Sequence, residues 1–158
     1  MNWRKWAPLT LFLVLAFAAA GIGAIATASS VDTWYGSLRK PAWNPPKAVF
    51  GPVWTMLYVL MAVATWRVWQ RGDPLSARIT VMLYALQLAL NALWSILFFG
   101  RQSPGAALVD ILALWLLLAI IFIRFWNRDR LAAALWAPYL LWVSFATALN
   151  SAIWKLNS

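Results

Sequence analysis

The chain has 158 residues, 64% of them hydrophobic, with 13 basic and 4 acidic side chains and a net charge of +9. It has no cysteine and no histidine, which excludes disulfides, thiolate chemistry, imidazole base catalysis and the usual side-chain ligands of zinc or haem iron. We therefore expect no metal site and no obligatory cofactor. Its charges divide the chain into five long apolar spans, the longest of which holds the 26 residues between Lys5 and Asp32. Because about 20 apolar residues cross a bilayer as a helix, the sequence predicts an all-α membrane protein, a single domain of five transmembrane helices.

The first span predicts a helix over about residues 6–28, with Pro8 acceptable in its first turn. Arg4 and Lys5 ahead of an apolar run are also typical of a secretory signal peptide. This run is longer than the 7–15 residues of a signal sequence, so we expect it to remain as a membrane helix.

The loop over residues 29–47 is predicted to form a lid. From Trp34 to Tyr58 the chain reads WYGSLRKPAWNPPKAVFGPVWTMLY. Proline fixes φ, and the residue before a proline is kept out of the helical region. The pairs Lys40-Pro41, Asn44-Pro45 and Pro45-Pro46 should therefore hold an extended, preshaped segment. Trp and Tyr favour the membrane interface. Arg39 and Lys40 could meet ligand carboxylates, or equally lipid headgroups.

Four further helices are predicted over about residues 48–69, 77–99, 104–126 and 131–156, with a turn at Gly72-Asp73-Pro74. Polar groups at bilayer depth are costly and usually face the bundle interior or a cavity. Three helices carry such groups or aromatic rings on one face, which predicts a pocket for a large, flat, mostly apolar ligand. The candidate ligand-binding residues are Trp34, Arg39, Trp43, Trp54, Tyr58, Asn91, Trp94, Trp142, Ala146 and Asn150.

Two polar positions have a second interpretation. Gln87 and Asn91 could simply tie helices together, an alternative that stays as open as ligand contact. Asp110 lies about two turns into the fourth helix, where we favour a structural hydrogen bond over a ligand contact.

The basic side chains stand singly or in small groups at the ends of apolar spans. There they anchor helices and attract anionic membrane lipid, which makes nucleic acid an unsuitable partner. Eight lie on the side of the N-terminus and five on the lid side. This imbalance favours a cytoplasmic N-terminus and a lid that faces outward.

A homodimer is expected from rows of small residues. Ala85, Ala89 and Ala92 lie on the face of the third helix away from Gln87 and Asn91, and small residues permit close helix contact in lipid. A rival seam is the first helix, where an alanine recurs every fourth residue from Ala20 to Ala28. Alternatively, these alanines pack within one chain.

The lid segment resembles the signature of the tryptophan-rich sensory protein and translocator family, once called the peripheral benzodiazepine receptor. Three further segments match the family, namely ALNALWSILFFG, PGAALVDILALWL and WAPYLLWVSFATALNSAIWKLN. The resemblance therefore covers essentially the whole chain. It implies a five-helix membrane bundle, commonly a homodimer. It also implies a pocket beneath the first loop that binds porphyrins and synthetic isoquinoline or benzodiazepine ligands.

The resemblance leads us to expect a membrane receptor or sensor for porphyrins, in a bacterial cell membrane. Trp54 and Trp142 match tryptophans implicated in porphyrin breakdown, so they are the candidate catalytic residues. No acid–base pair or nucleophile is present, and such breakdown would need light, oxygen and indole radicals. Transport of porphyrin or lipid-like ligands is a further alternative. Cholesterol is not favoured, because the family's sterol pattern is broken here, with Ser151 in place of its tyrosine.

Overall fold

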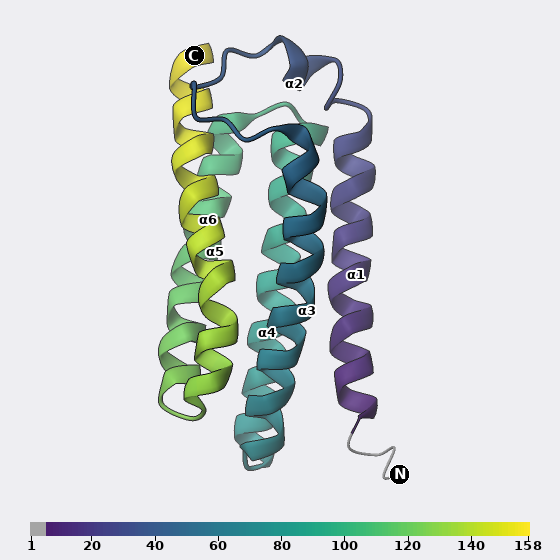
Figure 1. Ribbon diagram of the computed structural model, residues 1–158, viewed down its shortest axis with the longest axis vertical. Coiled ribbons are helices and arrows are strands. Elements are labelled where there is room, and N and C mark those ends of the chain that lie inside the picture. Colours follow the sequence, from purple (N-terminus) through teal and green to yellow (C-terminus); the bar gives the residue numbers. More distant parts are fainter. Residues whose placement is uncertain (1–5) are drawn as a thin grey trace.

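The computed structural model describes residues 6–158, which form five long helices and one short helix (Figure 1). All five long helices are long and apolar enough to cross a membrane, which confirms the predicted all-α bundle. Arg4 and Lys5, which enter the orientation argument, lie outside the described residues. The elements are α1 Ala7–Ala28, α2 Trp34–Ser37, α3 Lys47–Arg71, α4 Pro74–Ser95, η2 Ile96–Gly100, α5 Pro104–Trp126 and α6 Arg130–Asn157.

Successive long helices run antiparallel in a single bundle (Figure 1). α1 packs against α3 and α4 on one side, and α5 and α6 pair on the other. α3 contacts α6, and α4 contacts α5, so these contacts join the two sides. The segment with α2 crosses one end of the bundle, which we call the lid end. The opposite end, with the α3–α4 and α5–α6 loops, is the far end.

Local sequence explains where the helices begin. Pro74 and Pro104 occupy the first positions of α4 and α5, where a missing N–H costs nothing. The Asp73 carboxylate accepts from the backbone N–H groups of Leu75 and Ser76, both at 3.0 Å. This cap starts α4 three residues before the predicted position 77. Asp129 caps α6 in the same way, through the N–H of Leu131 at 3.0 Å.

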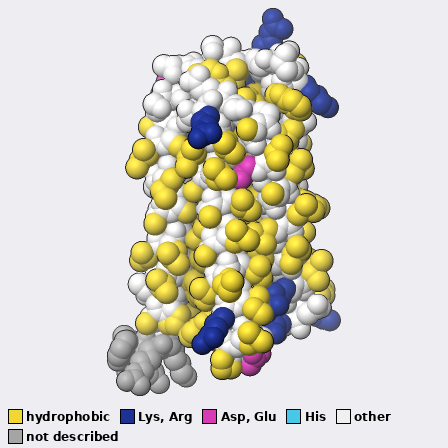
Figure 2. All heavy atoms as spheres, turned by 180° about the vertical axis from the view of Figure 1, so that it is seen from behind, with side chains coloured by type: hydrophobic (Ala, Val, Ile, Leu, Met, Phe, Trp, Pro, Cys, Tyr) yellow, Lys and Arg dark blue, Asp and Glu magenta, His cyan; other side chains and the backbone are white. Residues whose placement is uncertain are grey.

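Large apolar side chains cover the outside of the helices. Ile25, Val109 and Leu141 are 78%, 71% and 69% exposed. Figure 2 shows this apolar surface as a band along the bundle, with the basic side chains towards its two ends. An exposed apolar surface of this extent suits hydrocarbon rather than water. The chain is therefore an integral membrane protein.

Ion pairs join α3 to α6 at the far end. Arg67 Nε donates to Asp129 Oδ2 at 2.9 Å, and Arg71 pairs with the same oxygen. Burial opposes ionisation of Asp129, but the Arg67 hydrogen bond and both arginine charges outweigh it and hold the pKa of Asp129 below its usual range. Arg128 Nη2 also donates to Ser76 Oγ at 2.7 Å, which links the α5–α6 loop to α4. We call Arg67, Arg71 and Asp129 the far-end brace.

Candidate functional site beneath the lid

The lid begins with a helical turn that the sequence analysis did not predict, and this turn lies ahead of the proline pairs for which an extended chain was predicted. Trp34–Ser37 forms one helical turn, α2, and the chain becomes extended at Leu38, where ψ is 145°. The physical reason is that the first proline of the loop is Pro41, so it restricts only Lys40 and not the residues of α2.

Side chains from the helices hold the lid in place. Asn157 of α6 accepts from the Arg39 backbone N–H and donates to the Arg39 carbonyl, both at 2.9 Å. Ser30 Oγ donates to the Phe99 carbonyl at 2.9 Å. Within the lid, Tyr35 donates to Asn44 Oδ1 at 3.0 Å. The lid is thus fixed through hydrogen bonds to η2 and to the end of α6.

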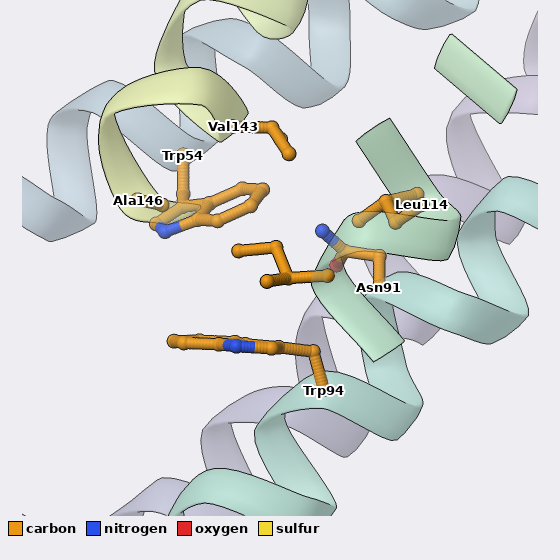
Figure 3. A pocket seen from close by; sticks show the side chains of 7 residues that line it. Trp54, Asn91, Trp94, Leu114, Val143 and Ala146 are labelled. Atoms are coloured by element: carbon orange, nitrogen blue, oxygen red, sulfur yellow. The ribbon is translucent and has the colours of Figure 1, made fainter. Parts of the chain in front are cut away.

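An enclosed cavity lies among four helices below the lid. Trp54 and Trp94 lie on opposite sides of it, and Asn91 lies to one side of the space between the two rings (Figure 3). It is lined by Trp54 of α3, Asn91 and Trp94 of α4, Ile111 and Leu114 of α5, and Val143 and Ala146 of α6.

The cavity is closed in this structure. Its volume is about 10 Å³, roughly the space of one water molecule. Sites for drug-sized ligands measure about 300–1,000 Å³. A flat ligand can therefore enter only if the surrounding rings or helices move apart.

Four predicted pocket residues line this cavity, namely Trp54, Asn91, Trp94 and Ala146. Two that we expected in its wall do not. Tyr58 is buried behind Trp54, with ring centroids 5.4 Å apart. Trp142 points to a different hollow, a groove on the outer side of α3 and α6.

The amides predicted on α4 serve to tie helices together. Asn91 Oδ1 accepts from Tyr58 at 2.9 Å, while its Nδ2 donates to Tyr139 Oη at 3.2 Å. Tyr139 in turn donates to Gln87 Oε1 at 3.1 Å. Gln87 is fully buried, whereas Asn91 also lines the cavity. Hydrogen bonds between helices are thus found for both amides, and Asn91 in addition lines the cavity.

The remaining candidate residues lie outside the cavity wall. Asn150 accepts from Trp94 Nε1 at 2.9 Å and donates to the Pro104 carbonyl at 2.8 Å, so its amide fixes a ring of the cavity without lining it. In the lid, Trp34 packs against Phe98 with ring centroids 5.6 Å apart. The ring centroids of Trp43 and Phe145 are also 5.6 Å apart. Arg39 is exposed.

Sequence reasoning missed three residues of the cavity. Ile111, Leu114 and Val143 line it, but they are ordinary apolar residues in apolar helices. Nothing in their identity separates a side chain that lines a cavity from one that fills the core. The only available signal is position, because Val143 directly follows Trp142 and Leu114 lies one turn beyond Asp110.

The tryptophans inside the membrane spans differ in how their indole N–H groups are used. Trp94, Trp115 and Trp136 donate to Asn150, Ser144 and the Leu118 carbonyl. Over residues 6–158, the indole N–H groups of Trp54 and Trp142 find no protein acceptor. These two N–H groups remain available to a ligand.

Asp110 is buried, with 7% of its surface exposed. Its Oδ2 atom has no hydrogen-bond partner among the described residues, so the predicted structural hydrogen bond is wrong for this oxygen. Asp110 is the seventh residue of α5, beyond the first turn, where backbone N–H groups are paired within the helix and offer no donor. Asp110 does not line the cavity.

The three alanines of α4 proposed for a dimer interface differ in solvent exposure. Ala85 and Ala89 are exposed on α4, as a contact with a second chain requires. Ala92 is buried, with 8% of its surface exposed, so it is not available to such a contact. The exposed row on α4 is therefore shorter than the sequence indicated.

Comparison with known proteins identifies the family. The TspO/MBR family matches residues 11–155. A tryptophan-rich protein TspO of Archaeoglobus fulgidus is 43% identical over 146 residues, which cover 92% of this chain and 94% of that protein. A tryptophan-rich sensory protein of Cereibacter sphaeroides is 40% identical (96% and 92% covered), and the translocator protein of Bos taurus is 37% identical (96% and 91% covered). With an aromatic cavity beneath a lid in a five-helix membrane bundle, the chain belongs to the TspO/MBR family.

Proposed function

We propose that this protein is a membrane receptor or sensor for porphyrins. The observation that carries the proposal is the cavity below the lid, where Trp54 and Trp94 lie on opposite sides of a small and mostly apolar space. Flat ring systems stack favourably between aromatic side chains. The surface of the cavity is apolar, and the Asn91 amide in its wall is already hydrogen-bonded to Tyr58 and Tyr139, so a mostly apolar ligand suits the site.

Binding requires the cavity to open. A volume of about 10 Å³ cannot hold a tetrapyrrole, so the ligand must bind a more open conformation that the free protein populates less. The cost of opening lowers the apparent affinity. The packing of Trp54 against Tyr139, at 6.2 Å between ring centroids, is what opening would disturb.

We expect protoporphyrin IX to quench the tryptophan fluorescence of the purified protein saturably in the dark, without loss of porphyrin absorbance. Trp54→Phe removes the ring and N–H of the cavity and should weaken this binding about tenfold. Trp126→Phe, at an exposed ring near the far end, is the matched control and should bind like the wild type. An absence of saturable quenching in the wild type would reject the proposal.

A second candidate function is the light- and oxygen-dependent breakdown of bound porphyrin. The observation in its favour is that the indole N–H groups of Trp54 and Trp142 are uncommitted and flank the same seam between α3 and α6. Repeating the titration under illumination separates the two functions. Breakdown predicts a light-dependent loss of absorbance that Trp54→Phe and Trp142→Phe abolish, whereas binding alone leaves the absorbance unchanged.

We further propose a homodimer in contact through the exposed alanines of α4. Replacing Ala85 and Ala89 by leucine should yield monomers in detergent with porphyrin binding intact, because bulky side chains prevent close helix approach. Light scattering after size-exclusion chromatography measures this. Leucine at Ala106 and Ala113, two exposed alanines of α5, is the control. A dimer that survives the α4 change but dissociates with bulky residues at Ala24 and Ala28 would place the seam on α1.

A further inference from the structure

A larger hollow lies outside the cavity, between α3 and α6. This groove has a volume of about 400 Å³, against about 10 Å³ for the enclosed cavity. A volume of 400 Å³ falls in the range of ligand sites. The groove is lined mainly by Val53 and Met56 of α3 and by Pro138, Leu141, Trp142 and Phe145 of α6.

The groove faces the bilayer. Val53 and Met56 lie six and nine residues after the start of α3, which places them about 9–14 Å below the lid end at 1.5 Å per residue. The side chains at its rim, Met56 and Leu141, are 52% and 69% exposed. Molecules dissolved in the hydrocarbon therefore reach the groove without passing the lid.

The groove and the cavity are two sides of one helix seam. On α3, Val53 lines the groove and its neighbour Trp54 lines the cavity. On α6, Trp142 lines the groove and its neighbour Val143 lines the cavity. Separation of α3 and α6 at this level would join the two spaces.

Both walls contain a proline where the groove lies. Pro52 of α3 and Pro138 of α6 have no backbone N–H, so the carbonyls of Ala48 and Ala134 lose their regular intrahelical partners. Helices bend most readily at such positions. The seam is thus weakened at the depth of the groove.

We propose that the groove between α3 and α6 is the lateral route by which the flat apolar ligand passes from the bilayer to the cavity. The occupant follows from the lining. Trp142 and Phe145 offer two rings with centroids 5.6 Å apart, and the Trp142 N–H has no protein acceptor within residues 6–158. An acyl chain would use neither a ring face nor a donor. This inference rests on the porphyrin binding proposed above.

The test is the rate of association, measured by stopped-flow quenching with protoporphyrin IX and protein reconstituted in phosphatidylcholine vesicles. Met56→Phe with Leu141→Phe fills the mouth of the groove and should slow association and dissociation about tenfold each, leaving the dissociation constant within about threefold. Val59→Phe with Ile120→Phe, at two other exposed apolar positions, is the matched control and should keep wild-type rates. Asn157→Ala loosens the lid and should not change the association rate.

Other results would overturn the route. Wild-type association in the groove variant would mean that only lipid occupies the groove. Faster association in Asn157→Ala, with no change in the groove variant, would mean that the ligand passes beneath the lid. A lost affinity with unchanged association would mean that the phenylalanines damage the site itself. Absence of quenching in the wild type would reject the proposed function and the route together. Normal binding in the groove variant at wild-type rates would reject the route alone.

Discussion

Replacing Asp129 by alanine should lower the free energy of unfolding by about 2–4 kcal/mol. The carboxylate is 8% exposed, caps α6, and pairs with both Arg67 and Arg71. Its removal leaves the partly buried Arg67 without its partner, and loss of one member of a buried pair is the costly case. The exposure of Arg71 reduces the effect. Unfolding titrations with sodium dodecyl sulfate in mixed micelles measure it.

The matched control is Asp32→Ala, which removes the ion pair with Lys47 at the lid. Both side chains of that pair are largely exposed, 76% for Asp32 and 65% for Lys47. Exposed pairs contribute about 0–1 kcal/mol, so this variant should unfold almost like the wild type. Equal destabilisation by both substitutions would contradict the structural role assigned to the far-end brace.

Replacing Ala146 by threonine should weaken porphyrin binding by roughly tenfold or more. Ala146 lines the cavity, which has about 10 Å³ to spare. The added atoms must occupy the space of the ligand or displace α6, and overpacking of this kind costs about 1–3 kcal/mol. At about 1.4 kcal/mol for each factor of ten, the dissociation constant rises accordingly. Fluorescence quenching in the dark measures it.

Ala148→Thr makes the same chemical change on the exposed side of α6 and controls for the lower helix propensity of threonine. It should leave the affinity at the wild-type value. Unchanged affinity in Ala146→Thr would mean that the ligand occupies another part of the molecule, and the outer groove would then be the first alternative.

The architecture could be predicted because its causes are local. Five apolar spans of membrane length, separated by charges and by turns such as Gly72-Asp73-Pro74, require five helices whatever their packing. The exception is α2. Its four residues have no length, cap or periodicity that marks a helix in the sequence, and its turn is stabilised by packing of Trp34 and Tyr35 against Phe98.

The cavity could be predicted only in part, because a helical stripe fixes which side chains share a face and not which neighbour they meet. Trp54 and Ala146 lie in the cavity wall, as their stripes indicated. Trp142 lies on the same stripe as Ala146, one turn away, yet it faces outward into the groove. The rotation of α6 that separates them depends on packing against α3 and α5, and no residue within α6 encodes it alone.

Because the far-end brace joins α3 and α6 at one end only, the two helices can rotate relative to each other about that end. Arg67 and Arg71 pair with Asp129 and so hold α3 to α6 at one end, and Trp54 lies thirteen positions before Arg67 along α3. That distance is about 20 Å along the helix, so a pivot of about 10° at the fastening displaces Trp54 by about 3.4 Å. This is the thickness of an aromatic ring. A small rotation at the far end therefore separates α3 from α6 at the level of Trp54 by enough to admit a planar molecule.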